Sequence, residues 1–431
     1  MSKTADLGGS QLPDRRIFIW FPLIALTFLF GFLYLWFSIF PGEIRTDAQN
    51  IFTLEQIQLG REYSQGIRIS YILSFFGQVI FLIWFLVKGR GELLAKQCRI
   101  WSRGSNPLAF LLFYFWLWLF LLIIQLPFTF FSSYLWQQYW GFSTQTLNGW
   151  VWDFLREATL DLVIGGLGVL LLYGVLRIWP RIWCVVCATL FSLWLIIQTF
   201  LWPIFFAPIY NTFQPVQNPQ IIAMVHELAK EGDLAIQEIL VMDASKRTTK
   251  ANAYFAGVGS TKQIVLYDNL LNNYSLPEIK AVIAHEMAHW QKGHIAKGLT
   301  LGILGSFILW GGAYLILSKE IRRGKTSPRI WAVLLLFFML CNFASSPIQN
   351  SISRQMEIEA DQTSVILTRD SEAAIALQIN LALGNRSDLS PPAFIEWFSY
   401  THPSVTNRIM KIREIQEKLS FGLNYFSNHL Y

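Results

Sequence analysis

Seven apolar segments of membrane-spanning length constrain the fold of this chain more than any other feature. Each approaches the roughly 20 residues that a helix needs to cross a bilayer. Because lipid cannot satisfy open backbone N–H and C=O groups, each spanning segment must be helical. The sequence therefore predicts a mainly α membrane protein with about seven transmembrane helices, at residues 17–40, 69–87, 108–126, 158–178, 182–202, 299–317 and 330–349.

Composition supports this class. Charged residues make up 14% of the chain, against about 25% in soluble domains. The net charge of +6 comes from basic residues beside apolar runs, which indicates contact with lipid headgroups and no nucleic-acid partner. The first run follows Arg15-Arg16 and is too long for a cleaved signal, so it predicts a first membrane helix. We expect an integral, multi-pass protein of a bacterial inner membrane or an ER-type membrane, in contact with the lipid bilayer.

Two groups of residues inside the apolar runs allow more than one interpretation. Cys184 and Cys187 have CxxC spacing, but a redox or zinc site needs a polar, accessible setting, so we interpret them as apolar filler. Asp161 lies in the fourth run. It sits either at the membrane edge or along an aqueous cavity, since intramembrane ionisable groups face bundle interiors or water.

The polar segment 206–298 interrupts the membrane runs and predicts a small α+β unit. An amphipathic helix is expected at Pro219 to Lys230, and strands at Ile236 to Val241, Asn252 to Gly257 and Gln263 to Tyr267, the last two joined by a turn at Gly257 to Ser260. Ser275 and Glu278 form a capping-box pattern, and the helix that they open is expected to run to about Lys297. We divide the chain into 1–205, 206–298, 299–349 and a C-terminal segment, 350–431.

That helix carries a metal-binding pattern. His285 and His289 are four residues apart, so both imidazoles lie on one face and can bind one ion. Glu286 is rotated about 100° from His285, which suits a base that takes a proton from a water activated by the metal.

A catalytic zinc site needs a third protein ligand. His294 is one residue short of the spacing that metzincins use, and we interpret it as a residue at the C-terminal end of the helix. Glu357 is the better candidate, because Asp361 follows on the same helical face and can accept a hydrogen bond from a ligand imidazole. Glu359 points elsewhere on that helix and is interpreted as structural.

These motifs together resemble the integral-membrane zinc metalloproteases typified by the type I CaaX prenyl endopeptidase, to which the shorter heat-shock protease HtpX is related. The resemblance covers nearly the whole chain, and its long N-terminal membrane region favours the CaaX-type branch. The matching segments include Leu126-Pro127-Phe128, Gly141 to Leu147, Ala207 to Tyr210, Phe213-Gln214-Pro215, Asp243 to Arg247, Asn252 to Gly257, the His285 helix, Ser353 to Asp361, and His402-Pro403 with Arg408.

The resemblance implies a gluzincin-like protease domain and seven helices around a water-filled chamber. It implies one Zn²⁺ per chain, held by His285, His289 and Glu357. Glu286 is then the general base, and Asp361 lies behind the ligands. His402 and Arg408 are expected near the scissile carbonyl, as catalytic residues that steady the oxyanion. Asn252 and Ala253 are expected on an edge strand that binds substrate backbone by strand addition.

The distribution of positive charge and the family resemblance predict opposite orientations in the membrane. Lysine and arginine are concentrated in the N-terminal tail and in the loops at 88–103, 177–181 and 319–329, which favours a cytoplasmic N-terminus. Seven spans then place the metal motif on the opposite side. The resemblance implies a metal domain in the cytosol.

The sequence thus predicts a monomeric membrane zinc metalloendopeptidase. Its substrates are peptides or proteins, either CaaX-type C-terminal tails or membrane proteins in quality control. No motif in the chain identifies a prenyl pocket. The alternative is a catalytically silent scaffold or chaperone that retains the zinc fold, although all of the motif residues are present. A transporter-like bundle is disfavoured, since no strong pair of broken helices is visible in the sequence.

Overall fold

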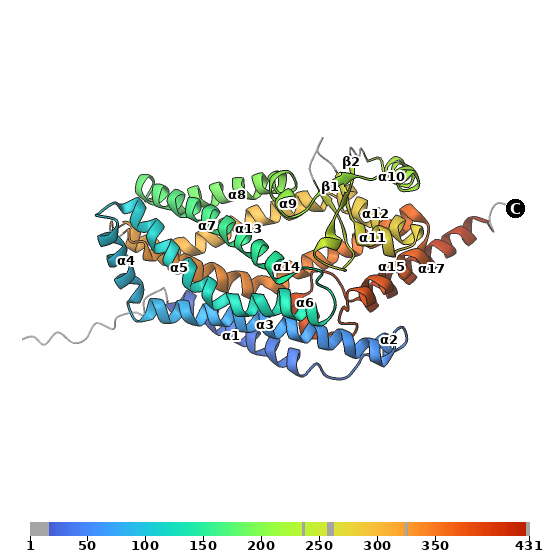
Figure 1. The fold of residues 1–431 in the computed structure, drawn as a ribbon, viewed down its shortest axis with the longest axis horizontal. Helices are drawn as coiled ribbons and strands as arrows, with labels where there is room; N and C mark the ends of the chain where they lie inside the picture. The colour runs from blue at the N-terminus through green and yellow to red at the C-terminus, as the bar shows by residue number, and fades with distance from the viewer. Residues whose placement is uncertain (1–16, 235–237, 257–262, 323, 325, 428–431) are drawn as a thin grey trace, which may run out of the picture.

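A computed structural model describes residues 17–427, apart from 235–237, 257–262, 323 and 325. Within these residues, seven helices are long and apolar enough to cross a membrane, as predicted. Figure 1 shows them running along the long axis of the molecule, with the β-sheet near one end and the short helix α4 at the other. The seven are α1 (Ile17–Ile39), α3 (Leu54–Val87), α5 (Asn106–Phe130), α7 (Leu147–Ile178), α8 (Trp183–Leu201), α13 (His294–Arg322) and α14 (Arg329–Thr368).

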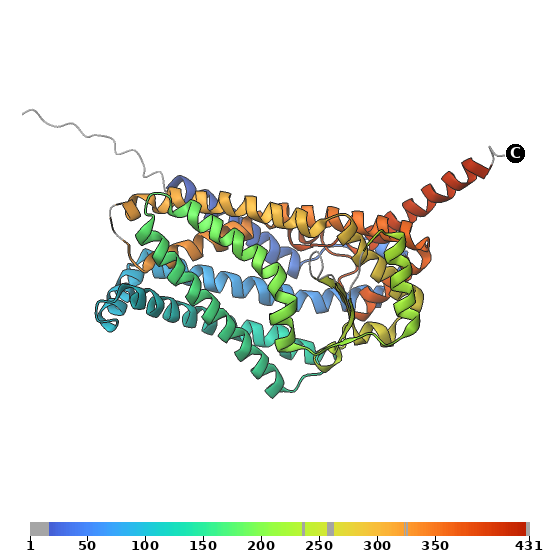
Figure 2. The same ribbon diagram turned by 90° about the horizontal axis from the view of Figure 1, so that it is seen from above.

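Several of these helices extend well beyond the predicted apolar runs. Helix α14 has 40 residues, which at 1.5 Å per residue is about 60 Å, twice the hydrocarbon thickness of a bilayer. The run at 330–349 therefore marked only its apolar half, and its polar half carries Glu357 and Asp361 out to the sheet end. Helices α8 and α13 lie side by side (Figure 2), where Ser192 and Ser306 share a hydrogen bond of 3.0 Å.

Short elements connect the long helices. Helix α5 continues through a π-helical turn, η1, into α6, and α8 continues likewise through η2 into α9. The remaining short elements of the membrane half are α2 (Thr46–Gln49), α4 (Arg90–Trp101), η1 (Phe131–Leu135), α6 (Trp136–Tyr139), η2 (Trp202–Phe206) and α9 (Ala207–Tyr210), and η3 (Ala244–Lys246) lies in the polar segment.

The sheet has four described strands in the order β1-β2-β4-β3. Strand β2 is parallel to β4, and the other two pairs are antiparallel. Strand β3 therefore forms one edge. The three predicted strands are present as β2 (Glu238–Met242), β3 (Ala253–Ala256) and β4 (Gln263–Tyr267), and β1 (Phe213–Pro215) was not predicted, being three residues long and ending in proline. The predicted turn at 257–260 lies outside the described residues.

Helix α12 (Leu276–Gln291) begins as the capping-box pattern predicts. The Glu278 carboxylate accepts hydrogen bonds from the backbone N–H and the hydroxyl of Ser275, at 2.9 and 2.7 Å. The prediction that this helix runs to Lys297 is wrong. It ends at Gln291, Gly293 takes a left-handed conformation with φ +67°, and His294 begins α13. His294 is thus the first residue of the next helix and not the last of this one.

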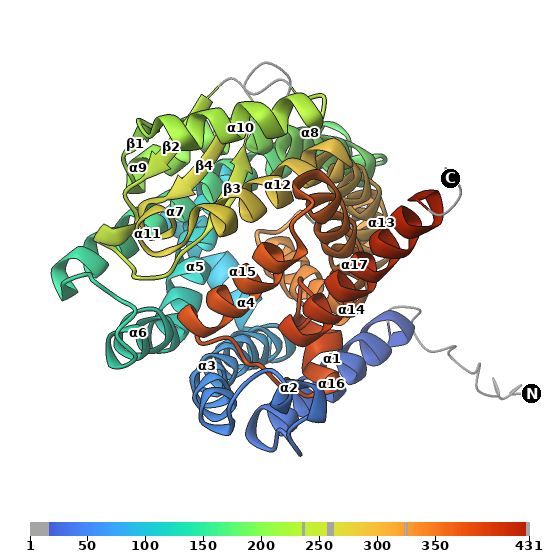
Figure 3. The same cartoon turned by 90° about the vertical axis from the view of Figure 1, so that its right-hand side faces the viewer.

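Around α12 lies the hydrophobic core of the sheet end. Ile283 and Met287 are fully buried there, together with Leu266 of β4 and Val365 of α14. Figure 3 looks at this end and shows α12 beside β3. This packing brings the polar half of α14 against the metal-binding face of α12. The other helices of this end are α10 (Pro219–Glu231), α11 (Asp268–Asn273), α15 (Ser371–Gly384), α16 (Ala393–Ser399) and α17 (Val405–Ser427).

Candidate metal centre

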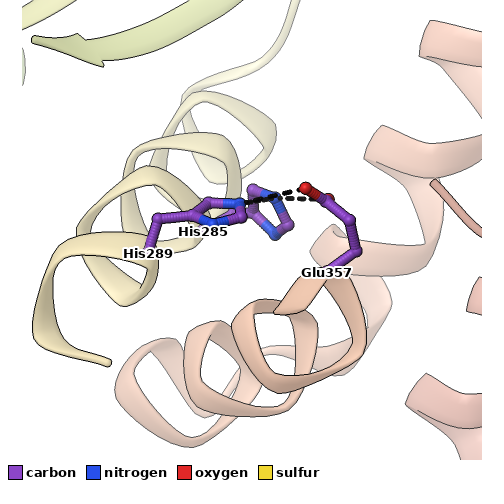
Figure 4. Close-up of side chains that lie close together, drawn as sticks. All are labelled: His285, His289 and Glu357. Carbon is purple, nitrogen blue, oxygen red and sulfur yellow. Dashed lines mark hydrogen bonds and ion pairs between the residues drawn. The ribbon is translucent and has the colours of Figure 1, made fainter. Parts of the chain in front are cut away.

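Three predicted ligands converge between α12 and α14. Helix α12 presents His285 and His289, and α14 presents Glu357 (Figure 4). The Nε2 atoms of the two histidines are 3.1 Å apart. Each lies 3.3 Å from one Glu357 oxygen, Oε2 for His285 and Oε1 for His289. One ligand atom from each residue lies within 4.8 Å of the others, so one ion can contact all three.

The chemistry of this group fits a divalent cation. Both Nε2 atoms point toward each other and toward a carboxylate, so three potential metal-ligand atoms gather at one place. Oε2 of Glu357 is also buried without a hydrogen-bond donor. Burial lowers the pKa of His285, but hydrogen bonds to the Asp361 and Glu357 carboxylates outweigh burial and raise this pKa to about 9. The surroundings thus favour positive charge, and two imidazoles with one carboxylate are a known zinc ligand set.

Behind His285 lies a buried ion pair. Oδ1 of Asp361 is 3.0 Å from Nδ1 of His285, as the i, i+4 spacing from Glu357 predicted. The guanidinium of Arg408 donates two hydrogen bonds to the same carboxylate, at 2.8 and 2.6 Å, and approaches Oε2 of Glu357 only to 4.0 Å. Arg408 therefore acts first on Asp361, and through it on the orientation of the His285 ring.

Behind His289 lies a second arrangement that the sequence did not reveal. Nδ1 of His289 is 2.9 Å from Nδ1 of His294, and Nε2 of His294 is 3.1 Å from Oε2 of Glu359. If Nε2 of His289 binds metal, its Nδ1 carries the proton and donates to His294. Nε2 of His294 then carries its own proton and donates to Glu359. The sequence feature that could have indicated this contact is Gly293 directly before His294, because a glycine can end a helix and redirect the histidine that follows it.

Glu286 is partly buried beside the metal ligands. Burial raises its carboxyl pKa, and the backbone of Phe255 in β3 hydrogen-bonds to it. A carboxyl group with a raised pKa holds a proton more readily near neutral pH, which suits a group that accepts and returns one. The contact with Phe255 also fixes the distance between Glu286 and the edge strand.

Three further predicted residues surround this centre. His402, in the loop between α16 and α17, places Nε2 3.3 Å from Oε2 of Glu357, and its side chain is 56% exposed. Asn252 precedes β3 and has an exposed side chain, and its carbonyl oxygen accepts a hydrogen bond from the Tyr267 N–H at 3.1 Å. Ala253 is buried at 4% exposure in the core, so only its backbone is available to a ligand.

Comparisons with known proteins cover both halves of the chain. The model of peptidase family M48 matches residues 215–416. A model described as CAAX prenyl protease N-terminal, five membrane helices, matches residues 42–212. These two regions together run from α2 into α17, and α1 lies outside them.

Individual relatives match over much of their length. An uncharacterized metalloprotease of Bacillus subtilis, YhfN, is 27% identical over 413 residues, which cover 88% of this chain and 93% of that protein. CAAX prenyl protease 1 of Saccharomyces cerevisiae is 28% identical, covering 69% of this chain and 70% of that protein. The crystal structure of S. mikatae Ste24p matches with a TM-score of 0.81 and 24% identity, over 93% of this chain and 99% of that chain. This match shows that the chain shares the overall fold of that structure.

Proposed function

Because the chain belongs to the CAAX prenyl protease family of M48 peptidases and is a membrane metalloendopeptidase, we propose that His285, His289 and Glu357 bind one zinc ion per chain. Glu286 is then the general base of peptide hydrolysis. The convergence of three acceptor atoms between α12 and α14 carries this proposal. A catalytically silent scaffold is not favoured, because the ligands and the base are all present in one site.

The side chains of this centre have different roles in hydrolysis. When bound, the zinc ion supplies Lewis acidity, which favours attack by water on a peptide carbonyl. Glu286 accepts the proton of the attacking water and delivers it to the nitrogen of the leaving amine. His402 is directed at the ligands from an exposed loop, where its imidazole can donate a hydrogen bond to the oxyanion. Arg408 holds Asp361 and so keeps the His285 ring in place.

The edge of the sheet offers a place for the substrate backbone. Among the described strands, β3 pairs only with β4, so its other side can pair with an extended peptide. Asn252 and the backbone of Ala253 lie at the start of this edge, and Phe255 contacts Glu286. A peptide added to β3 therefore passes the base, and we assign Asn252 and Ala253 to substrate binding.

The substrate is proposed to carry an apolar segment. A cavity of about 490 Å³ lies at β3, and its lining includes the side chains of Trp202, Tyr254 and Phe255. Such a wall suits aliphatic side chains or a hydrocarbon group. Both substrate classes, CaaX-type C-terminal tails and membrane proteins in quality control, present groups of this kind. The protein is proposed to act as a monomer on either.

Substitution of Glu286 by glutamine tests the mechanism. Glutamine keeps the shape of the side chain and cannot accept the proton. We expect kcat/KM for peptide cleavage to fall by about 10² to 10⁴-fold, the usual contribution of a general base. Metal analysis of the same preparation should still find about one zinc per chain. A variant that cleaves at the wild-type rate would overturn the assignment of Glu286.

Matched substrates separate the two substrate classes. A farnesylated CaaX peptide, the same peptide without its prenyl group, and an unfolded membrane protein are compared by kcat/KM. Preference for the farnesylated peptide supports the CaaX class. If the unprenylated peptide is cleaved as well as the farnesylated one, or is the only one cleaved, the enzyme is not specific for prenylated CaaX tails. Quality control of membrane proteins then remains as the function.

A further inference from the structure

Membrane helix α3 makes polar contacts with the segment that carries His402. We call residues 385–404, between α15 and α17, the His402 segment. Nη2 of Arg68 donates to Oδ2 of Asp388 at 2.8 Å and to the hydroxyl of Tyr400 at 2.7 Å. Arg68 is 7% exposed and Asp388 3% exposed. A buried charge is costly unless it is paired, and here both charges are buried and paired.

A second contact lies two turns earlier on the same helix. Gly60 packs so closely on the segment that a Cβ atom there would lie 2.2 Å from the carbonyl oxygen of Ser387. Only glycine permits this approach. Beside it, Nη2 of Arg61 donates to the carbonyl oxygen of Ser390 at 2.9 Å. The His402 segment is thus attached to α3 at two points about 12 Å apart along the helix axis, which fixes its direction as well as its position.

The same segment is held on both sides of His402, before it by a contact from α14 and after it by a contact within the segment. Nη1 of Arg354 donates to the carbonyl oxygen of Tyr400 at 2.7 Å. After His402, the backbone N–H of Ser404 donates to Oε1 of Glu396 at 2.9 Å. His402 itself is exposed, and its imidazole lies 3.3 Å from Oε2 of Glu357 and 2.9 Å from the hydroxyl of the adjacent Thr401. The place of its imidazole therefore depends on the backbone that carries it.

We propose that α3 is a positioning element for the reaction, and that Arg68 fixes the imidazole of His402 over the metal ligands through Asp388 and Tyr400. The inference rests on the proposed role of His402. It adds that the N-terminal membrane region sets the geometry of a group that faces the substrate. Arg68 and Tyr400 are positioning residues, because neither contacts the metal ligands.

Tyr400→Phe is the most discriminating variant, since it removes one hydroxyl and leaves the ring and both buried charges. We expect kcat to fall about tenfold, the equivalent of one hydrogen bond to a charged group, with KM and zinc content unchanged. Arg68→Gln should lower kcat further. Arg68→Lys keeps the charge beside Asp388, so its kcat should lie between that of Arg68→Gln and that of the wild type. Tyr71→Phe, on the exposed side of α3, is the matched control and should leave kcat unchanged.

A spin label reports position without relying on activity. A nitroxide is attached at His402→Cys in a chain whose four native cysteines are replaced by alanine. Its electron paramagnetic resonance spectrum should show greater mobility when Tyr400→Phe is added. An unchanged spectrum together with an unchanged kcat overturns the inference. Full activity of His402→Ala would instead contradict the proposed role of His402, so the two failures are distinguishable.

Discussion

The two ligand histidines lie four residues apart on one helix, yet the protein supports them in different ways. Behind His285, the buried carboxylate of Asp361 lies directly at Nδ1 and is itself held by Arg408, whose side chain is 12% exposed. Behind His289, the neutral ring of His294 intervenes before the next carboxylate, that of Glu359. The Glu359 side chain is 47% exposed and also contacts Lys297. The ring of His285 is thus held directly by a buried carboxylate. The ring of His289 is held by His294, which in turn contacts a carboxylate at the surface; we call His294 and Glu359 the relay.

The difference predicts unequal contributions to metal binding. A hydrogen bond from an imidazole to a carboxylate makes the other ring nitrogen a stronger ligand, and burial strengthens the effect because water cannot screen it. A neutral imidazole polarises its partner less, and an exposed carboxylate is readily replaced by water. We therefore expect Asp361, behind His285, to contribute more to zinc affinity than His294, behind His289. Glu359, at the end of the relay, should contribute least.

Asp361→Asn is expected to have the largest effect. It removes the charge from His285 and leaves the buried guanidinium of Arg408 without its carboxylate. Zinc affinity should fall about 100-fold, or about 2.7 kcal/mol, the upper end of the range for groups behind metal ligands. Competition with a chromophoric chelator measures it. Thermal unfolding should also begin at a lower temperature, because an unpaired buried charge is destabilising.

His294→Leu is expected to have the intermediate effect. Leucine fills similar space and offers no acceptor, so Nδ1–H of His289 loses its partner. Zinc affinity should fall about tenfold, or about 1.4 kcal/mol, by the same chelator assay. His294→Gln is the control, since its amide oxygen can accept that hydrogen bond and should restore part of the affinity. A loss equal to that of Asp361→Asn would show that the two supports are equivalent.

The sequence predicted one of these supports and missed the other for a physical reason. His285, His289, Glu357 and Asp361 share helical faces, and helical periodicity is a local property that the sequence carries directly. The role of His294 depends on where α12 stops. A continuous helix to Lys297 would place His294 on an unrelated face, whereas the left-handed turn at Gly293 returns it toward His289.

The same limit applies to the fold. Within the described residues, the apolar runs identified all seven helices that are long and apolar enough to cross a membrane, because membrane insertion depends on length and hydropathy. They did not reveal how far the polar half of α14 continues, nor the short strand β1, which exists only through pairing with β2. The contacts of Arg68 with Asp388 and Tyr400 join residues more than 300 positions apart. Such contacts follow from packing, which no local pattern encodes.

Glu359→Gln gives the smallest expected effect and the sharpest test of the comparison. The amide oxygen still accepts the hydrogen bond from His294, and water already reaches the site. The charge pair with Lys297 is exposed, and pairs of this kind contribute about 0.5 kcal/mol. Zinc affinity should therefore fall about two- to threefold, and less at high salt, where the pair is screened. If the loss instead matches that of Asp361→Asn and persists at high salt, the relay transmits the Glu359 charge to the metal through His294, and the two histidines are supported alike.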